Sequence, residues 1–323
     1  MRPLSSPLVQ NGPELASRQT TEGKSASRRL LVLVCAYNEE QSLPILLQSL
    51  KKRWDVLVID DGSVDRTGIV AANHGTSLIT HEQRLGKAAS LADGISYALQ
   101  NSYDFVVEIG ADAIPRHDSV DKIIERLEKQ NVGAVSCKQI PQGKGTIASR
   151  IDELIWAILA EGKSIQMKTR GSSHLGAVMF GFKPQLVDSV EGSVNDDEEV
   201  GISITNKGYR IEFREDALVF FDASSCIGHI QERRKRMYYG HMRFSESTAP
   251  SMELATSAVA LTKTIISKPT KLIWVLPTLL LDFQARLLAW RDLRNPSRAK
   301  SYSRWVTTYA KDNSLVIRNS TSS

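Results

Sequence analysis

The sequence predicts an α/β protein whose open, mostly parallel sheet is flanked by helices and followed by a helical C-terminal extension. Three observations lead to this fold class. Short aliphatic runs alternate with amphipathic helical patterns over the first half of the chain, as in successive βαβ units. The runs end in turn-forming and acidic residues, and from about Gly228 onward the pattern is helical, basic and aromatic. With 323 residues, the chain can bury a sizeable core.

Aliphatic segments of the first half are predicted as strands because each is short, apolar and bounded by turn signals. They cover residues 30–37, 55–60, 76–81 and 132–139, and residues 104–115 are predicted to be the fourth strand followed by a loop. The second half is less regular. Residues 173–184 have a strand-like pattern with glycines, and residues 209–223 are expected to form a hairpin or a bent strand.

The intervening segments have the spacing of amphipathic helices. Asn38 is predicted to cap the first helix, with Gln41 at the capping-box position. The second helix is expected to begin at about Val64 and to end at Gly75. Further helices are predicted over residues 86–100, 117–130 and 150–165.

Composition divides the chain into three parts. Residues 1–28 are polar and rich in Ser, Pro and Gln, and are predicted to be a disordered tail that lacks the apolar core of a signal peptide. Residues 29–247 are expected to form the α/β domain, and residues 248–323 the helical extension. No segment offers the roughly 20 uninterrupted apolar residues of a spanning helix, because Pro277 and Asp282 interrupt the best candidate.

The net charge, the cysteines and the absence of certain motifs limit the range of possible functions. The formal net charge of +5 and the pI of about 9.0 fit a nucleotide or a lipid phosphate as ligand. Cys35, Cys137 and Cys226 have neither metal-ligand spacing nor a disulfide framework, which is typical of a reducing compartment. The sequence contains no phosphate loop, no strand–GxGxxG–helix unit and no GxSxG elbow, so those enzyme classes lack their main support.

Acidic side chains follow two of the predicted strands. Asp60 and Asp61 end the run "VLVIDD", and Asp112 follows the fourth strand. Ligands of open parallel sheets bind at the carboxyl ends of strands, and adjacent like charges need a cation, a donor-rich ligand or water. Asp-Gly-Ser is also good turn chemistry before a helix. The residues alone therefore leave a ligand site and a simple turn both open.

Six segments, in order, resemble the motifs of the family 2 glycosyltransferases, which have the GT-A fold. Four lie within residues 30–115: "VCAYNEEQSLPILLQSL", "VLVIDDGSVDRTG", "RLGKAASLADGI" and "VVEIGADAIP". The fifth is "NDDEEVGISITNKGYRI" (195–211), and the sixth is "RRKRMYYGHMRF" (233–244), which resembles the family's QxxRW segment with Arg233 for Gln and Met237 for Trp. The resemblance covers about two-thirds of the chain and implies a GT-A-type open mixed, mostly parallel sheet.

The resemblance also implies a site for a nucleotide-sugar donor. The donor-binding residues that it assigns are Tyr37, Asn38, Glu39, Asp60, Asp61, Lys87, Arg234 and Arg236. Other roles stay open for several of them. Asn38 and Glu39 also suit a plain helix cap, and Lys87 also suits a solvated surface position. The basic run 233–236 would pair with a departing diphosphate or with anionic lipid.

Asp112 is the implied ligand of a divalent cation, Mg²⁺ or Mn²⁺. The family's Asp-x-Asp motif is Gly110-Ala111-Asp112 here, so the first Asp is missing. One carboxylate can suffice when phosphate oxygens and water complete the shell, and Glu108 is near enough in sequence to assist. Asp197 is the implied general base, with Asp196 as its neighbour. The alternative for this acidic run is a solvated helix end.

We therefore expect an inverting, metal-assisted glycosyltransferase that moves a sugar from a nucleotide diphosphate to a hydroxyl or phosphate acceptor, either a glycan or a polyprenyl lipid. Residues 272–290 combine aliphatic residues and tryptophans with basic flanks, which predicts a helix in the headgroup region of a membrane. The expected location is cytoplasmic, peripheral on the inner face of the cell membrane. Packing of this helix on the domain or on a partner is the alternative, and no nucleic-acid partner is expected.

Two other functions remain open at this point. A catalytically degenerate partner subunit with the same fold is favoured by Gly110 and by the altered QxxRW segment. A sugar-phosphate nucleotidyltransferase would need a glycine-rich basic loop after the first strand, and "CAYNEEQS" does not supply one.

Overall fold

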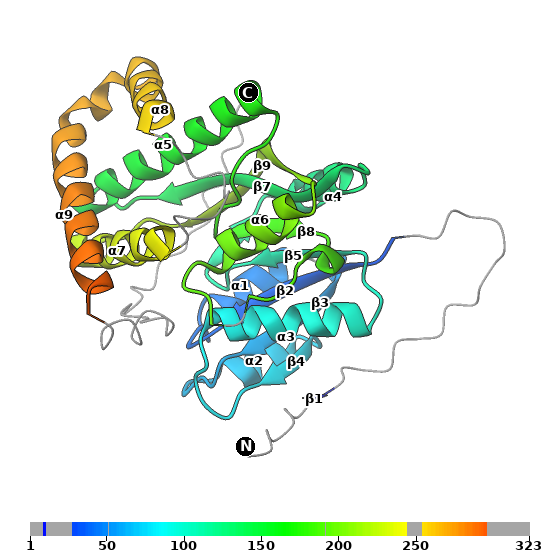
Figure 1. Cartoon of the computed structure of the whole chain (residues 1–323). Coiled ribbons are helices and arrows are strands. Elements are labelled where there is room, and N and C mark those ends of the chain that lie inside the picture. Colours follow the sequence, from blue (N-terminus) through cyan, green and yellow to red (C-terminus); the bar gives the residue numbers. More distant parts are fainter. Residues whose placement is uncertain (1–8, 11–27, 51, 191, 244–253, 296–323) are drawn as a thin grey trace.

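The computed structural model describes residues 9–10, 28–50, 52–190, 192–243 and 254–295. Within them a nine-stranded mixed sheet has the order β1-β4-β3-β2-β5-β8-β7-β9-β6 (Figure 1). The strands are β1 (Val9–Gln10), β2 (Leu30–Ala36), β3 (Asp55–Asp60), β4 (Ser77–Thr80), β5 (Phe105–Ile109), β6 (Ala113–Pro115), β7 (Val132–Gln142), β8 (Met179–Phe182) and β9 (Arg210–Asp222). This confirms the predicted fold class, an open mixed sheet with flanking helices.

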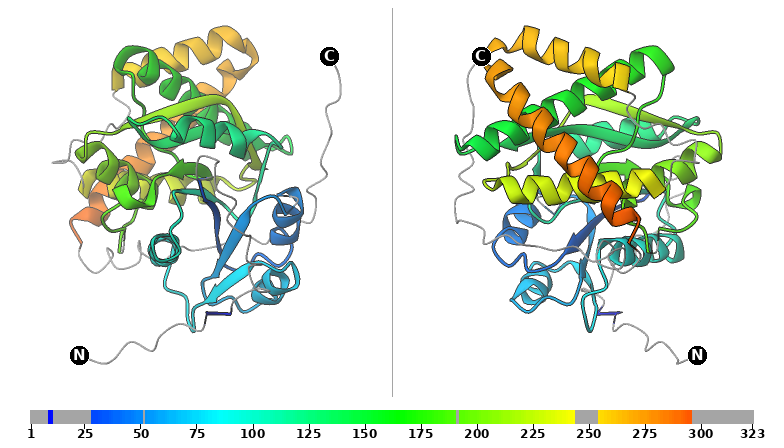
Figure 2. Two further views of the ribbon diagram at one scale, coloured as in Figure 1. Left: turned by 90° about the vertical axis from the view of Figure 1, so that its right-hand side faces the viewer. Right: turned by 60° about the vertical axis from the view of Figure 1, so that its left-hand side comes forward.

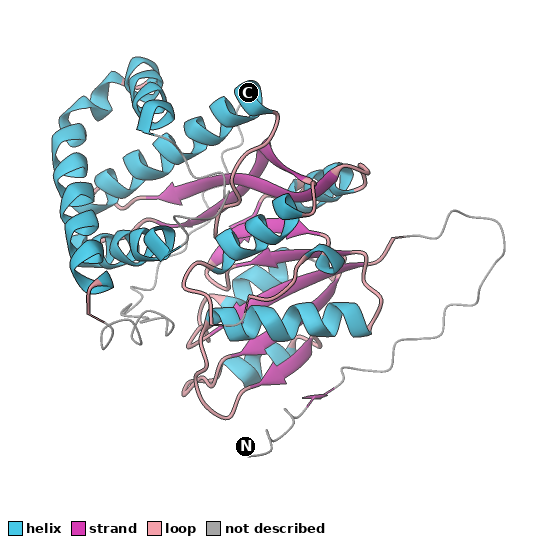
Figure 3. Ribbon diagram, viewed as in Figure 1, coloured by secondary structure: helices cyan, strands magenta, loops and turns pink. Residues whose placement is uncertain are grey.

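Helices flank the sheet and continue beyond it (Figure 3). The described α-helices are α1 (Leu43–Ser49), α2 (Thr67–Asn73), α3 (Lys87–Gln100), α4 (Ser119–Leu127), α5 (Ile147–Arg170), α6 (Asp196–Asn206), α7 (Ile227–Arg243), α8 (Leu254–Ser267) and α9 (Val275–Leu293). Short 3-10 helices cover Pro184–Leu186 and Pro269–Trp274.

The first half of the sheet is parallel and the second half is mixed. β2 pairs in parallel with β3 and β5, and β3 pairs in parallel with β4. β8 runs antiparallel to both β5 and β7, whereas β9 pairs in parallel with β7 through an irregularity between Cys137 and Lys138. β9 is thus a single bent strand, one of the two forms expected for residues 209–223. The carboxyl ends of β2, β3 and β5 meet at one edge, where ligands of such sheets bind.

Alternating side chains of the buried strands supply two apolar layers. On β2, Val32 and Val34 pack into the layer that also contains residues of α1, α2 and α4. Leu31 and Leu33 pack into the opposite layer, together with residues of α3 and α6. Because both faces of these strands are covered, their sequences are apolar throughout rather than alternating.

The first helix is not capped by Asn38, so that prediction was wrong. α1 has Ser42 at its N-cap, and Asn38 adopts a left-handed backbone conformation with φ of 55°. The Asn38 Oδ1 atom accepts a hydrogen bond from Val64 N at 3.0 Å, and Asn38 N donates to Ser63 Oγ at 3.0 Å. Asn38 therefore joins the loop after β2 to the loop after β3. Because residues 63 and 64 belong to that contact, α2 begins only at Thr67.

The predicted helical extension is present, and it packs on the domain. α8 packs against α5, and α9 crosses α7 (Figure 2). Leu281 joins an apolar cluster with residues of α5 and α7, and Ala285 and Ala289 join a second one with Tyr238 and Tyr239. The other face of α9 is exposed to solvent and apolar. It carries Leu276, Leu280, Phe283, Leu287 and Trp290.

Pro277 does not interrupt α9, contrary to the sequence expectation. It lies in the first turn of the helix, where the missing N–H would have no intrahelical partner. By length and composition alone, Pro269–Leu293 is a helix that could cross a membrane. This differs from the expectation that no segment qualifies, because the helix is apolar on average although it contains Asp282 and Arg286.

Only part of the predicted terminal segments lies within the described residues. Val9–Gln10 pair antiparallel with β4, which contrasts with the disorder predicted for residues 1–28. The remainder of that prediction, apart from Arg28, lies outside the described residues. The same is true of residues 248–253 and 296–323 in the predicted extension.

Candidate active site

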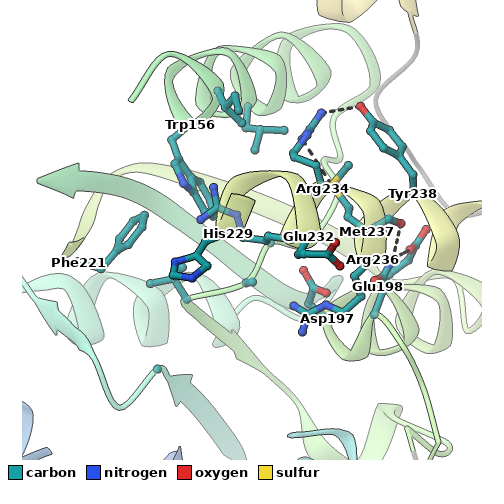
Figure 4. Close-up of a pocket in the computed structure, with 18 of the residues that line it drawn as sticks. Trp156, Asp197, Glu198, Phe221, His229, Glu232, Arg234, Arg236, Met237 and Tyr238 are labelled. Carbon is teal, nitrogen blue, oxygen red and sulfur yellow. Dashed lines mark hydrogen bonds between the residues drawn. The ribbon is translucent and has the colours of Figure 1, made fainter. Parts of the chain in front are cut away.

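A cavity of about 1020 Å³ lies at the carboxyl edge of the parallel strands. The loops after β2, β3 and β5 contribute to its wall, as do α5, α6, α7, α8 and α9. Figure 4 shows side chains from α5, α6 and α7 turned toward this space, among them Trp156, Asp197 and His229. The predicted site residues that border the cavity are Tyr37, Glu39, Asp61, Lys87, Asp112, Asp197, Arg234 and Arg236. Asn38, Asp60 and Asp196 do not border it and instead support their neighbours.

Asp60 and Asp61 are adjacent in sequence but have different surroundings. Asp60 Oδ1 accepts a hydrogen bond from Ser63 N at 3.0 Å, which closes the turn toward α2. Asp61 borders the cavity, and its two carboxylate oxygens accept hydrogen bonds from Leu85 N and Gly86 N, each at 2.8 Å. Asp60 therefore stabilises a turn, whereas Asp61 positions the loop that leads into α3.

His81 compensates the charge of Asp61. Its Nδ1 atom lies 2.8 Å from Asp61 Oδ1, and its Nε2 atom lies 2.9 Å from Asp93 Oδ2. Burial lowers the pKa of His81, but the hydrogen bonds to the two carboxylates outweigh it and raise the pKa to about 9. His81 is therefore a cation at neutral pH, placed between the carboxyl groups of Asp61 and Asp93.

Arg84 is a site residue that the motif comparison did not single out. Its guanidinium lies over the ring of Tyr37, 4.1 Å from the centroid, at the cavity wall. The Nε and Nη2 atoms of Arg84 are buried and have no hydrogen-bond acceptor among the described residues. Two adjacent guanidinium donors of this kind match the oxygens of a phosphate. Its only sequence signal was its place as the first residue of the segment "RLGKAASLADGI".

Lys87 is paired rather than solvated. Its Nζ atom lies 3.0 Å from Asp196 Oδ2 and 3.3 Å from Glu108 Oε1. Burial lowers the pKa of Lys87, but the charges of Asp196 and Glu108 outweigh it and raise the pKa above its usual range. Burial raises the pKa of Glu108 to about 7 despite the nearby ammonium. This cluster joins β5, α3 and α6 beneath the cavity.

Asp112 borders the cavity in the loop between β5 and β6. Gly110, which stands where the family motif has its first Asp, donates its N–H to Val178 O at 2.8 Å. A Cβ atom at Gly110 would lie 3.1 Å from Asp112 Oδ1. In the described ranges, no group of three His, Cys, Asp or Glu side chains could hold a metal ion by itself. A single carboxylate beside an open cavity fits a hard cation whose remaining ligands are diphosphate oxygens and water.

Asp197 is the carboxylate that faces the cavity from the first turn of α6. Among the described residues its side chain has no hydrogen-bond partner, and it is only partly exposed. Burial and the charge of Asp196 raise the pKa of Asp197, and Lys87 opposes the shift. Its neighbours are engaged elsewhere, because Asp196 pairs with Lys87 and Glu198 lies 2.7 Å from His241 Nδ1.

The basic residues of α7 have distinct partners. Arg233 forms an ion pair with Asp152 of α5. Arg234 Nε donates to Asp282 Oδ1 of α9 at 2.9 Å, and Arg234 also bonds to Tyr238 Oη. These contacts explain why an acidic residue stands in the middle of the apolar helix α9. Arg236 borders the cavity on the same side as Asp197 and Glu198 (Figure 4).

Comparison with known proteins assigns the family. Residues 31–190 match the sequence profile of Glycosyl transferase family 2, and the chain belongs to this family. An undecaprenyl-phosphate mannosyltransferase of Micrococcus luteus is 27% identical over 124 residues, which are 36% of this chain and 51% of that protein. A polyprenol monophosphomannose synthase of Mycolicibacterium smegmatis is 25% identical over 126 residues, 36% of this chain and 48% of that protein. The chain thus spans about half the length of these relatives.

The matches among solved structures are distant in sequence. Glucosyl-3-phosphoglycerate synthase from Mycobacterium tuberculosis, in complex with phosphoglyceric acid, has a TM-score of 0.49 and 19% identity. The match covers 70% of this chain and 82% of that one. A second structure of the same enzyme, which contains Mn²⁺, uridine-diphosphate-glucose and phosphoglyceric acid, has a TM-score of 0.48 and 20% identity, with coverage of 68% and 80%.

Proposed function

We propose that the protein is an inverting glycosyltransferase that moves a sugar from a nucleotide diphosphate to a lipid-linked acceptor at a membrane surface. One observation supports this most directly: a single cavity is bordered by Asp61, Asp112, Asp197 and Arg236, and its outer wall is formed by α8 and α9. Asp61, Asp112 and Arg236 would lie beside the nucleotide and its diphosphate, Asp197 would serve as the general base, and α8 and α9 would contact an apolar acceptor.

The donor would be held at the carboxyl ends of β2 and β3. Tyr37 and Arg84 present a ring and two unpaired guanidinium donors to the cavity. Asp61 fixes the backbone of Leu85 and Gly86 and so determines where Arg84 and Lys87 lie. Arg84 would bind diphosphate oxygens, and the positive end of α3 would face the same charge.

A divalent cation, Mg²⁺ or Mn²⁺, would be held by Asp112 together with diphosphate oxygens and water. When bound, such a cation neutralises charge that develops on the leaving diphosphate. Arg236 would add to this stabilisation from α7. Arg234 is held by Asp282 and Tyr238, so its proposed role is to fix α9 on α7 while lending positive charge to the cavity.

Asp197 is the proposed general base for a hydroxyl acceptor. The acceptor oxygen would form a bond to the anomeric carbon while the bond from that carbon to the diphosphate oxygen breaks. The electron pair would leave with the nucleoside diphosphate, and the hydroxyl proton would pass to Asp197. A phosphate acceptor already carries an anionic oxygen, so the transfer would then need no general base and no proton would pass to Asp197.

The lipid-linked acceptor and the membrane location are supported by the extension. α9 binds the domain through one face and exposes an apolar face flanked by Lys271, Arg291 and Arg294. Apolar side chains beside basic ones suit the headgroup region of an anionic leaflet. The names of the two mannosyltransferase relatives, which refer to polyprenol phosphates, agree with such an acceptor. We propose that the protein lies on the cytoplasmic face of the membrane.

The test is a transfer assay with a panel of nucleotide sugars, Mn²⁺ and a polyprenyl phosphate or a lipid-linked glycan. We expect Asp197→Asn to lower transfer to a hydroxyl acceptor by roughly 10²- to 10⁴-fold while nucleotide binding is kept, because general-base catalysis contributes about that much. Glu125→Gln, an exposed acid on α4, is the matched control. Background turnover in both wild type and Asp197→Asn with every acceptor of the panel, the polyprenyl phosphate included, and with normal nucleotide binding, would instead indicate a degenerate partner subunit.

A further inference from the structure

Lys163, in the middle of α5, is a buried charge that the proposed chemistry does not use. Its side chain is 2% exposed, yet it borders the cavity. Its Nζ atom donates to Ser136 Oγ at 2.9 Å and to Gln139 Oε1 at 3.3 Å, and both acceptors are neutral. No carboxylate of the described residues lies within ion-pair distance of Nζ. An unpaired buried ammonium is costly to a fold, so it calls for an anion that the protein itself does not supply.

The surroundings of Lys163 are shaped around its amino group. A Cβ atom at Gly176 would lie 2.2 Å from Lys163 Nζ, so the backbone passes there without a side chain. Gln139 Nε2 donates to Ala177 O at 3.0 Å, which turns the Gln139 amide oxygen toward Lys163. An ammonium has three donors. Ser136 and Gln139 accept two of them, and Nζ also lies 5.7 Å from the centroid of the Phe213 ring, so the third donor has no hydrogen-bond acceptor among the described residues.

The electrostatics of this position suit the binding of an anion. Burial lowers the pKa of Lys163 to about 8, partly offset by Cys137 and Asp197, so the cation is the main form at neutral pH. The ammonium and the Asp197 carboxylate each influence the charge state of the other. An anionic acceptor beside Asp197 would be repelled unless a cation balanced it, and Lys163 is placed to do so.

The face of α5 that carries Lys163 is otherwise apolar. Ile155, Trp156 and Leu159 border the cavity from preceding turns of the same helix. α8 and α9 add further apolar side chains to the wall, namely Leu254, Ala258, Leu261 and Leu279. A wall that combines apolar side chains with one buried ammonium matches an amphiphilic molecule with an anionic end.

We propose that Lys163 binds a phosphate oxygen of the acceptor, which is therefore a phosphate ester. This inference rests on the proposed transferase function, since it assigns the acceptor of the same cavity. Ser136 and Gln139 position the ammonium, and the apolar face of α5 contacts the organic part of the acceptor. The shared chemistry is a phosphate monoester, carried either by a lipid or by a small soluble molecule.

The test is a titration of the full chain, without donor, against farnesyl phosphate, farnesol and glycerol 3-phosphate. We expect wild type to bind farnesyl phosphate at least about tenfold more tightly than farnesol, and Lys163→Met to lose that preference. Lys168→Met, an exposed lysine on the same helix, is the matched control and should keep it. Comparable affinity for glycerol 3-phosphate and farnesyl phosphate would support the phosphate assignment and identify the source as a soluble ester.

Lys163→Met can fail to fold, so wild type provides a second measurement. Farnesyl phosphate should slow the acetylation of Lys163, followed by mass spectrometry, whereas farnesol should not. Equal slowing by both ligands, or by neither, would overturn the proposal, as would a folded Lys163→Met variant that still prefers farnesyl phosphate. None of these readouts needs sugar transfer. Absence of transfer with the preference intact would therefore count against the transferase function alone.

Discussion

At the scale of single residues, neighbours in sequence have separate tasks. Asp60 closes a turn, whereas Asp61 accepts two backbone hydrogen bonds from the loop before α3. Asp196 neutralises Lys87, whereas Asp197 faces the cavity without a protein partner among the described residues. In both pairs the two adjacent side chains point in different directions. The two like charges therefore lie in separate environments.

This separation predicts different effects of the two substitutions Asp61→Asn and Asp60→Asn. An Asn side chain at position 61 offers only one acceptor oxygen, so its amide group would oppose the N–H of Leu85 or Gly86. We expect nucleoside diphosphate affinity to fall at least about tenfold in Asp61→Asn, measured by calorimetry, because the loop that carries Arg84 shifts. Asp60→Asn should change that affinity less than about threefold and lower mainly stability. The reverse order would contradict this assignment.

His81 predicts a dependence of stability on pH. The pKa of His81 is raised from 6.5 to about 9 in the folded protein, so its protonated form contributes stability that is complete below pH 6.5. That contribution is lost as the pH rises through about 9. The stability difference between wild type and His81→Gln, from urea unfolding, should therefore shrink by more than half between these limits. His117→Gln, at an exposed position, should show no such trend. A constant difference for His81→Gln would count against the charged pair.

At the scale of elements, α9 is apolar on two sides for different reasons. One side packs on α7 through Leu281, Ala285 and Ala289, and Asp282 holds it there by binding Arg234. The opposite side exposes a contiguous apolar surface, which in water favours aggregation. Binding to a membrane surface would cover this apolar surface and leave the ion pair between Asp282 and Arg234 inside the protein.

The exposed face gives a prediction for membrane binding. Leu276, Leu280 and Phe283 are 66%, 60% and 62% exposed, so replacing them with Ser should leave the thermal midpoint nearly unchanged. Flotation with anionic vesicles should weaken at least about tenfold, because each buried apolar side chain contributes roughly 1.5 to 3 kcal/mol. Val64→Ser with Ile69→Ser removes exposed apolar surface elsewhere and serves as the control. Recovery of wild type entirely in the soluble fraction would refute interfacial binding.

At the scale of the whole molecule, the sheet brings distant segments to one cavity. Asp61 and Asp112 lie on loops after β3 and β5, Asp197 opens α6, and Lys163 reaches the same space from α5. The parallel strands β2, β3 and β5 have their carboxyl ends at one edge of the sheet. The positions of Asp61 and Asp112 could therefore be predicted from the parallel strands alone. The extension then closes the cavity from outside with α8 and α9.

Much of this arrangement could be predicted because it depends on local patterns. Aliphatic runs located β2, β3, β4, β5 and β7 to within a few residues, and helical spacing located α3 and α5, but the loop expected after β5 contains a further strand, β6, that was not predicted. Asn38 was misassigned because its partners, Ser63 and Val64, come from another loop. Lys163 lies outside the six motif segments, and Arg84 begins one of them without an assigned role, because the roles of both depend on burial and on their neighbours in space.

The sequence by itself determined the fold class, the family and the acidic positions at the strand ends, since these depend on periodicity and on motif order along the chain. Only the tertiary structure decided which acid of each pair faces the cavity, that Lys87 is buried between Glu108 and Asp196, and that Asp282 fastens α9 to α7. The physical reason is that charge and burial of a side chain depend on neighbours that folding brings together from distant parts of the chain.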